Sequence, residues 1–375
     1  PVTVRARLRD EGDRLWVSHA HFVAGQSGVV DLSQQPPLHG TYSGADSMGL
    51  LWSMQLDAAE GEVSRFMKRS VAPIVITYTA EVDYQVVTTA TLERLYIAEW
   101  VDRIPVREGR LVGTFFRPTG RGPYKPVMVI GGADGGMYEG VAARLASHGF
   151  AALSLAYFGT DHLLPHLNNV PLEYFKLAVS WLQAQPNVAP GGVAAVGWSR
   201  GGEGALLLAA TMPQVTGVVA YVPSALHTVS SSLGVPDLVQ GQSSWSHGGR
   251  SLTFLPMPPN IKPESLVTSG PVSLRPLYEA ALTNSAVVER ALIPVERING
   301  PVMLISGEDD ALWPSSLFSE MIMQRLARHG HPHRREHLSY PGAGHTIGIP
   351  YRPTAVTRHR TPSGVLLEYG GNAAG

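Results

Sequence analysis

Apolar and polar residues alternate along the first hundred positions with the period of two that is typical of half-buried β-strands. Residues 2–8 (Val-Thr-Val-Arg-Ala-Arg-Leu) and residues 15–22 both follow this alternation. Residues 73–87 are rich in valine, isoleucine, threonine and tyrosine, which pack well on a pleated surface. No long segment repeats with the period of a helix, so the pattern predicts an all-β sandwich over residues 1–104.

From about residue 105 the pattern changes to short apolar runs separated by amphipathic segments. Buried strands are expected over residues 127–130, 151–157, 193–197, 215–222 and 301–306, with a short last strand over 338–340. Helices are expected over residues 138–148, 172–185 and 201–210. This alternation predicts a mostly parallel sheet with helices on both faces, an α/β domain over residues 105–375.

One stretch interrupts this rhythm. Residues 223–275 are rich in serine, proline and glycine and show only weak periodicity. The stretch is long for a plain connection between two elements of a compact domain. We therefore expect an insert that covers the functional site.

The composition excludes several classes of function. The 375 residues carry 29 Lys and Arg against 30 Asp and Glu, a net charge of −1, so nucleic acid is a poor partner. The chain has no cysteine, which excludes disulfides, zinc–thiolate sites, iron–sulfur clusters and a cysteine nucleophile. No apolar run approaches the roughly 18–20 residues that span a bilayer. Because the start also lacks the apolar region of a signal peptide, we expect a cytoplasmic protein.

The clearest chemical motif is the G-x-S-x-G pentapeptide Gly197-Trp198-Ser199-Arg200-Gly201, which lies between a predicted strand and a predicted helix. In that setting a sharp turn exposes the serine hydroxyl, and the two glycines avoid a Cβ clash. We therefore expect Ser199 to be a nucleophile and the N–H of Arg200 to be an oxyanion donor at the helix N-terminus. The simpler alternative is an ordinary helix start capped by Ser199.

A serine nucleophile needs a base, and the base needs an orienting acid. In a fold of this kind the acid and then the histidine follow the serine along the chain. Asp310 comes just after the predicted strand 301–306, with Asp309 as the alternative acid. His345 lies on a glycine-rich loop after the last strand, so we expect it to be the general base.

The substrate should be held by groups near this serine. The glycine-rich loop at residues 131–136 lets backbone N–H groups approach a substrate oxygen, and we expect Ala133 to supply the second oxyanion donor. A phosphate-binding loop is the alternative, but no G-K-[ST] sequence and no spaced G-x-G-x-x-G follows the strand. Trp198 would line the substrate pocket or pack under the turn. Arg200 and Arg250 are candidates to bind phosphate groups of a substrate, with a solvated surface charge as the simpler interpretation.

Taken together, these motifs resemble the acyl-CoA thioesterase and bile acid-CoA:amino acid N-acyltransferase family over almost the whole chain. The resemblance rests on motifs in the same order, at residues 4–10, 46–52, 156–158, 172–175, 197–203, 294–297, 309–313 and 344–345. It implies an α/β-hydrolase fold preceded by an immunoglobulin-like all-β sandwich, with Ser199, Asp310 and His345 as the triad. Family members also have a strand before the position of Pro1 and a helix after that of Gly375, so we expect a chain trimmed at both ends.

The family contains thioesterases with serine at the nucleophile position, which is Ser199 in this sequence, and an N-acyltransferase with cysteine at that position. Ser199 favours hydrolysis, because water readily attacks an oxygen ester whereas a thioester intermediate suits an amine. We expect hydrolysis of an acyl thioester through an acyl-enzyme, without a cofactor or a metal. The carrier (coenzyme A or acyl carrier protein), the acyl length and the oligomeric state do not follow from the sequence. Transfer to an amine or alcohol, an esterase or lactonase, and a non-enzymatic binding protein are the alternatives.

Overall fold

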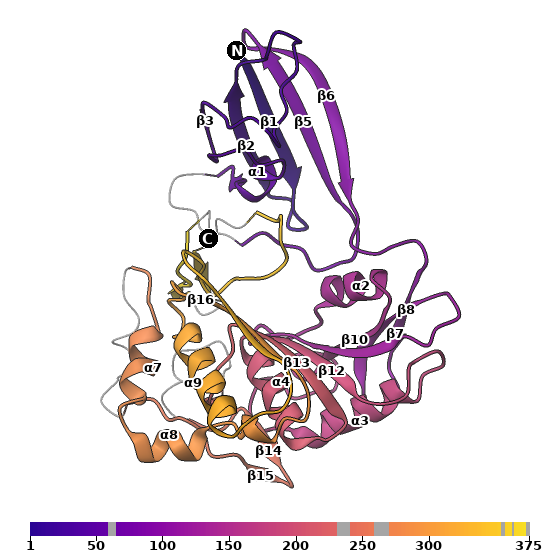
Figure 1. The fold of residues 1–375 in the computed structure, drawn as a ribbon, viewed down its shortest axis with the longest axis vertical. Coiled ribbons are helices and arrows are strands. Elements are labelled where there is room, and N and C mark those ends of the chain that lie inside the picture. Colours follow the sequence, from indigo (N-terminus) through magenta and orange to yellow (C-terminus); the bar gives the residue numbers. More distant parts are fainter. Residues whose placement is uncertain (59–64, 231–240, 259–269, 354–356, 362–363, 373–375) are drawn as a thin grey trace.

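The computed structural model describes residues 1–58, 65–230, 241–258, 270–353, 357–361 and 364–372. An antiparallel sheet of N-terminal strands stands above a larger sheet that has helices on both faces (Figure 1). The chain therefore has the expected fold class, an α/β-hydrolase fold preceded by an all-β region. None of the helices within these ranges combines the length and apolar character that crossing a bilayer requires.

The N-terminal sheet has the strand order β3-β2-β1-β5-β6, with β4 also paired to β2. Its elements are β1 Val2–Arg9, β2 Leu15–Phe22, β3 His39–Gly40, α1 Gly49–Trp52, β4 Gln55–Leu56, β5 Ile74–Val82 and β6 Gln85–Arg94. Alternate residues of β2, including Trp16 and Phe22, are buried, as the sequence pattern predicts. The β-rich run that begins at residue 73 is two strands, because Asp83 and Tyr84 take positive φ angles of 48° and 64° and close a tight hairpin.

The larger sheet has the order β17-β16-β13-β12-β9-β10-β8-β7 and is parallel from β10 to β17. Its strands are β7 Val101–Val106, β8 Val112–Pro118, β9 Lys125–Ile130, β10 Phe150–Ala156, β12 Val193–Trp198, β13 Val215–Tyr221, β16 Val302–Gly307 and β17 Arg335–Tyr340. The predicted boundary at residue 104 lies within a few residues of the start of this sheet. It falls inside β7, which pairs with β8 from Val101 onward, so this sheet already begins there.

Helices cover both faces of the larger sheet. Those that contact its strands are α2 Glu139–Ser147, α3 Leu172–Gln183, α4 Arg200–Thr211 and α9 Ser315–Arg328. The chain before β16 also forms α7 Arg275–Ala281, α8 Ser285–Ala291 and the short 3₁₀ helix η1 Val295–Arg297. Successive residues of β9 point to opposite faces. Val127 and Val129 pack with the alanines of α2, whereas Met128 and Ile130 belong to the cluster that contains α3 and α4.

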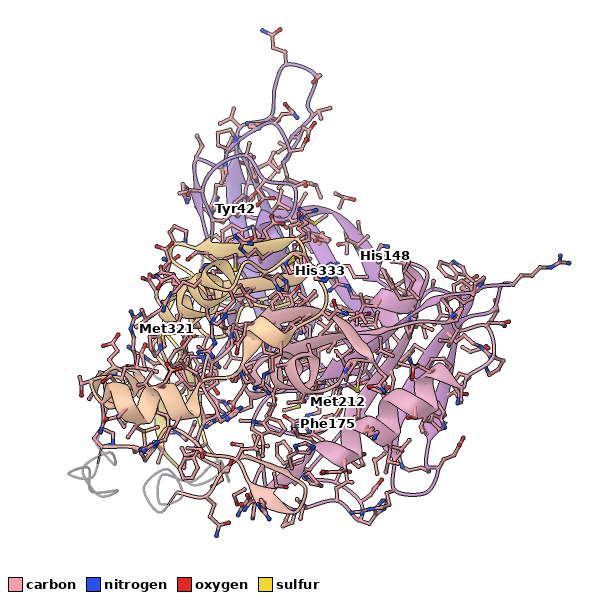
Figure 2. All side chains as sticks on the ribbon, turned by 60° about the horizontal axis from the view of Figure 1, so that its bottom comes forward. Tyr42, His148, Phe175, Met212, Met321 and His333 are labelled. Atoms are coloured by element: carbon pink, nitrogen blue, oxygen red, sulfur yellow. The ribbon has the colours of Figure 1, made fainter. Side chains whose placement is uncertain are left out.

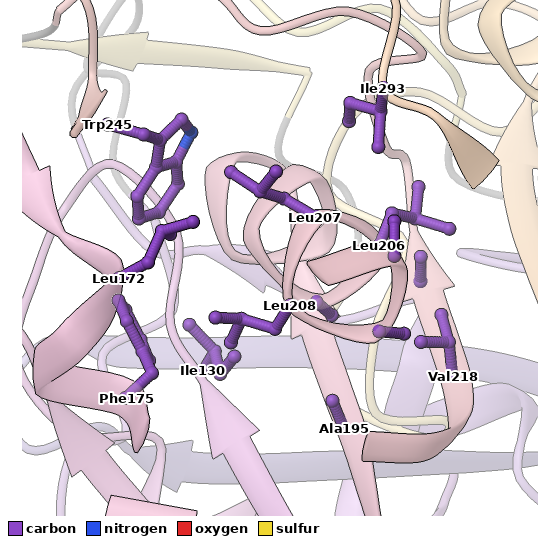
Figure 3. Close-up of a cluster of buried hydrophobic side chains, with 14 of the residues drawn as sticks. Ile130, Leu172, Phe175, Ala195, Leu206, Leu207, Leu208, Val218, Trp245 and Ile293 are labelled. Carbon is purple, nitrogen blue, oxygen red and sulfur yellow. The ribbon is translucent and has the colours of Figure 1, made fainter. Parts of the chain in front are cut away.

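The apolar side chains form separate cores in the two sheets. Tyr42 belongs to the N-terminal core, whereas Phe175 and Met212 belong to the large core (Figure 2). In the large core Ile130, Phe175 of α3 and residues 206–208 of α4 belong to one cluster with Trp245 (Figure 3). Residues 206–208 of α4 are almost completely buried, so this helix is held rigidly between the sheet and the segment that carries Trp245.

The insert at residues 223–275 is joined to this core. Its residues 231–240 and 259–269 lie outside the described part of the chain. Within the rest, β14 Trp245–His247 pairs with β11 Val170–Pro171 and with β15 Arg250–Ser251. The Trp245 ring stacks on Tyr157 at 5.8 Å between centroids. A second small hairpin, β18 Arg358–Arg360 and β19 Leu366–Glu368, follows the last strand of the large sheet.

Three of the four histidines at residues 329–337 have separate hydrogen-bond partners for their side chains. His331 bonds to the carbonyl oxygen of Gly300, His333 to the side chain of Asn299 and His337 to Ser306. In the described part of the chain, no three His, Cys, Asp or Glu side chains are grouped so that they could hold a metal ion.

Candidate active site

The turn between β12 and α4 holds Ser199 in an unusual backbone conformation, with φ 54° and ψ −117°. The turn is tight enough that glycine is required on both sides of the serine. A Cβ on Gly197 would lie 2.0 Å from the carbonyl oxygen of Gly201, and one on Gly201 would lie 2.3 Å from that of Gly131. The Ser199 side chain makes no hydrogen bond to the helix N-terminus, so the capping interpretation is wrong. The hydroxyl is therefore not used as a helix cap and can interact with other side chains.

Substituting Gly201 with alanine should test this geometry. The new methyl group would meet backbone oxygens of Ile130 and Gly131 at 2.4 Å and 2.3 Å, and backbone cannot move aside cheaply. We expect G201A to lower the free energy of unfolding by about 1–3 kcal/mol or more, measured by urea denaturation. Gly217→Ala is the matched control, because its Cβ would have no neighbour closer than 3.8 Å. Equal stability of the two variants would contradict the argument.

The structure brings together the three residues proposed as a triad. The Ser199 hydroxyl lies 2.9 Å from Nε2 of His345, and Nδ1 of His345 lies 2.8 Å from Oδ2 of Asp310. Because a carboxylate only accepts hydrogen bonds, Nδ1 carries the proton and Nε2 is left to accept from the serine. His345 is 8% exposed and Asp310 is fully buried. The arrangement can therefore draw a proton from the hydroxyl.

Asp310, and not Asp309, faces the histidine. The second oxygen of Asp310 accepts hydrogen bonds from the N–H groups of Leu312 and Trp313, which fix the carboxylate in place. Asp309 is exposed, and its own N–H donates to the carbonyl oxygen of Ala343. Of the two acids that the sequence left open, Asp310 is the one that contacts His345.

Tyr369, which sequence reasoning missed, connects the acid and the histidine. Its carbonyl oxygen accepts the N–H of His345 at 2.8 Å and that of Ala311 at 3.2 Å. Its ring lies 5.8 Å from the imidazole. Burial raises the pKa of the Tyr369 hydroxyl to about 12, so the ring remains uncharged at neutral pH. No motif signalled this residue, because it lies beyond β19, far from the triad in sequence.

The glycine-rich loop at residues 131–136 lies beside the turn that carries Ser199. A Cβ on Gly132 would lie 3.4 Å from the carbonyl oxygen of Trp198. Neither the Ala133 N–H nor the Arg200 N–H donates to an acceptor among the described residues. Asp134 in the same loop pairs at 3.1 Å with Arg65, so the N-terminal region reaches this loop directly.

The expectation for the side chain of Arg200 is wrong. It is neither a solvated charge nor free to meet coenzyme A phosphates, because the residue is 3% exposed. Its guanidinium lies against Glu203, Tyr278 and the ring of Trp313. Arg250, the other candidate, is exposed on β15.

Trp198 packs against protein neighbours. Its ring stacks on Tyr221 at 4.3 Å between centroids and lies 5.8 Å from the ring of Tyr138. These rings are packed against the apolar cluster beneath α2. Trp198 thus packs under the turn while staying partly exposed, and its role in lining the substrate pocket stays a prediction.

Two family models match the chain. The model described as BAAT / Acyl-CoA thioester hydrolase C terminal matches residues 170–374. The model described as Acyl-CoA thioester hydrolase/BAAT N-terminal region matches residues 1–108. The N-terminal match covers the first sheet and β7, and the C-terminal match covers β12, β13, β16 and β17 of the larger sheet. Strands β8, β9 and β10 lie between the two matches.

Curated relatives align over nearly the whole chain. Acyl-coenzyme A thioesterase 1 of Mus musculus is 32% identical over 99% of this chain and 84% of its own length. Acyl-coenzyme A amino acid N-acyltransferase 1 of the same species is 32% identical over 99% of this chain and 86% of its own. Among solved structures, a putative dienelactone hydrolase from Klebsiella pneumoniae has a TM-score of 0.42 at 18% identity, covering 66% of this chain and 87% of its own.

Proposed function

The chain belongs to the acyl-CoA thioester hydrolase/BAAT family, and we propose that it hydrolyses an acyl thioester through an acyl-enzyme on Ser199. The observation that carries the proposal is the continuous hydrogen-bond chain from Asp310 through His345 to the Ser199 hydroxyl. The names of the curated relatives favour coenzyme A as the carrier, with acyl carrier protein as the alternative. The chemistry needs no cofactor.

In the proposed mechanism the Ser199 oxygen attacks the thioester carbonyl while Nε2 of His345 takes the hydroxyl proton. Asp310 keeps the imidazole in the required tautomer and stabilises its protonated form. The N–H groups of Arg200 and Ala133 hold the oxyanion, each contributing about 2.7–4 kcal/mol to transition-state stabilisation. His345 then protonates the departing thiol sulfur. A water molecule, deprotonated by His345, attacks the acyl-enzyme and releases the carboxylic acid and free Ser199.

The proposed division of the chain has an all-β domain that ends before Val101 and a catalytic domain that follows it. The contact between Arg65 and Asp134 supports a role for the first domain in holding the oxyanion loop. Ile349, which follows the His345 loop, also packs against the N-terminal core. A cytoplasmic location stays a prediction, because relatives named mitochondrial and peroxisomal occupy other compartments.

Acyl transfer to an amine is the second candidate function. It is favoured by one observation, since an N-acyltransferase is as similar to this chain as the thioesterases are. Both reactions share the acyl-enzyme and differ only in what attacks it. Serine at position 199 supports hydrolysis, because its oxygen ester is less suited to capture by an amine than a thioester is.

Steady-state assays with a panel of acyl-CoA lengths, with and without added amino acids, test this proposal. We expect free acid and thiol in equal amounts, with kcat in the range of about 1–10³ s⁻¹ for the best chain length. We also expect the thioester to react faster than the matching oxygen ester. Amide in excess over free acid would show a transferase instead, and preference for the oxygen ester would show an esterase.

A further inference from the structure

The first turn of α4 holds a pair of buried opposite charges that the mechanism above does not use. The side chains of Arg200 and Glu203 are 4% and 0% exposed, and their nearest nitrogen and oxygen atoms lie 3.4 Å apart. Burying a charged pair has a large desolvation cost and often adds little stability. A pair in this position, one residue and four residues after the nucleophile, therefore calls for an explanation beyond stability.

Glu203 has donors around both carboxylate oxygens. One oxygen accepts the N–H of Thr228 at 2.9 Å and Nε1 of Trp245 at 2.8 Å. The other accepts the Thr228 hydroxyl at 2.5 Å and faces the guanidinium of Arg200. These neighbours donate hydrogen bonds or carry positive charge, and the two oxygens of a carboxylate can accept all of these bonds. Glu203 therefore places a negative charge in the first turn of α4, four residues after Ser199. Its hydrogen bonds to Thr228 and Trp245 attach the insert to α4.

Arg200 places the matching positive charge near the catalytic histidine. Its guanidinium carbon lies 5.3 Å from the centroid of the Trp313 ring, and that centroid lies 5.3 Å from the centroid of the His345 ring. The guanidinium and the imidazole are therefore no more than about 11 Å apart, the sum of the two steps. Because Trp313, which contacts both groups, is only 2% exposed, water does not screen the interaction fully.

We propose that Arg200 and Glu203 are positioning residues whose balanced charges set the pH range in which His345 works as a base. A lone guanidinium at this distance would disfavour the imidazolium, and a lone carboxylate would favour it. Side by side, the two effects largely cancel. The inference rests on the proposed function, since it assumes that His345 is the base.

Other charged or titratable groups also lie near His345. Asp310 is its hydrogen-bond partner, and the uncharged Tyr369 ring lies on another side. His359 stacks on Tyr369, and burial lowers its pKa, which keeps it neutral near pH 7. The Arg65–Asp134 pair is a further balanced pair beyond Tyr369. None of these groups changes charge when Arg200 or Glu203 is replaced, so the expected shifts keep their signs.

The test is the pH dependence of kcat/KM in three variants. E203Q leaves Arg200 alone and should move the midpoint of the acid limb to lower pH, by up to roughly one unit at an effective dielectric of about 20. R200M leaves Glu203 alone and should move the midpoint to higher pH. In the double variant R200M/E203Q the midpoint of the acid limb should return close to its wild-type pH. In R200K this midpoint should stay unchanged. Backbone N–H groups are retained in every variant.

A second readout separates this inference from the choice of substrate. A fluorophosphonate probe reacts with an activated serine: the Ser199 oxygen bonds to phosphorus, fluoride leaves, and His345 takes the proton. The pH profile of this reaction should show the same opposite shifts even if thioesters prove not to be substrates. Single variants with the wild-type midpoint, or shifts in the same direction, would overturn the inference. If E203Q does not fold, R200M alone tests the inference. A midpoint shift to higher pH supports it, and no shift or a shift to lower pH overturns it.

Discussion

Replacing Ser199 with alanine should lower kcat for thioester hydrolysis by about 10⁶-fold. The side chain of Ser199 hydrogen-bonds to the imidazole of His345, so the variant lacks both the attacking oxygen and the proton that His345 would take. Water would have to attack the thioester directly, and the acyl-enzyme could not form. The N–H groups around the oxyanion remain, so a residual rate of about 10³–10⁴ over the uncatalysed reaction should persist. Single-turnover measurements with the preferred acyl-CoA would measure it.

A second serine–histidine pair provides the control for this variant. Ser306 on β16 bonds to Nε2 of His337 at 2.7 Å, much as Ser199 bonds to His345. Ser306 does not lie at a strand-to-helix turn, and His337 has no hydrogen-bonded carboxylate among the described residues. S306A should therefore keep thioester activity within about twofold of wild type. An activity loss below tenfold in folded S199A would remove the serine from the mechanism.

The local part of the site was predictable from the sequence. The spacing of Gly197, Ser199 and Gly201 encodes the turn, because only glycine fits where backbone oxygens approach within 2.0–2.3 Å of a Cβ position. The buried parallel strands β9, β10, β12, β13 and β16 were also predicted, because each contains a short apolar run of the kind that a parallel sheet requires. In both cases the information lies within a few residues of the element that it specifies. The antiparallel strand β8 was not predicted.

The features that the sequence did not yield depend on distant partners. The burial of Arg200 is one, because Tyr278 and Trp313, which enclose it with Glu203, are far away in sequence. An arginine considered alone is expected at the surface. The domain boundary is another. β7 reads Val-Asp-Arg-Ile-Pro-Val, which is not a continuous apolar run, and only its pairing with β8 assigns it to the larger sheet.

Replacing Asp310 with asparagine should lower kcat by about 10⁴-fold, the second-largest effect that we expect. An amide nitrogen facing Nδ1 of His345 would donate a hydrogen bond where the carboxylate accepts one. The imidazole would then carry its proton on Nε2 and could no longer accept the proton of Ser199. The fold should be retained, because the amide oxygen can still accept the N–H groups of Leu312 and Trp313.

Asp309→Asn is the matched control for D310N, because it makes the same chemical change one residue earlier. Asp309 is exposed, and the one bond that its backbone makes to Ala343 does not involve the side chain. D309N should therefore keep kcat within about twofold of wild type. A large loss in D309N together with a small one in D310N would transfer the role of the orienting acid to Asp309. Because the two carboxylates are adjacent in sequence but differ in burial and partner, the comparison isolates the contact with His345 as the cause.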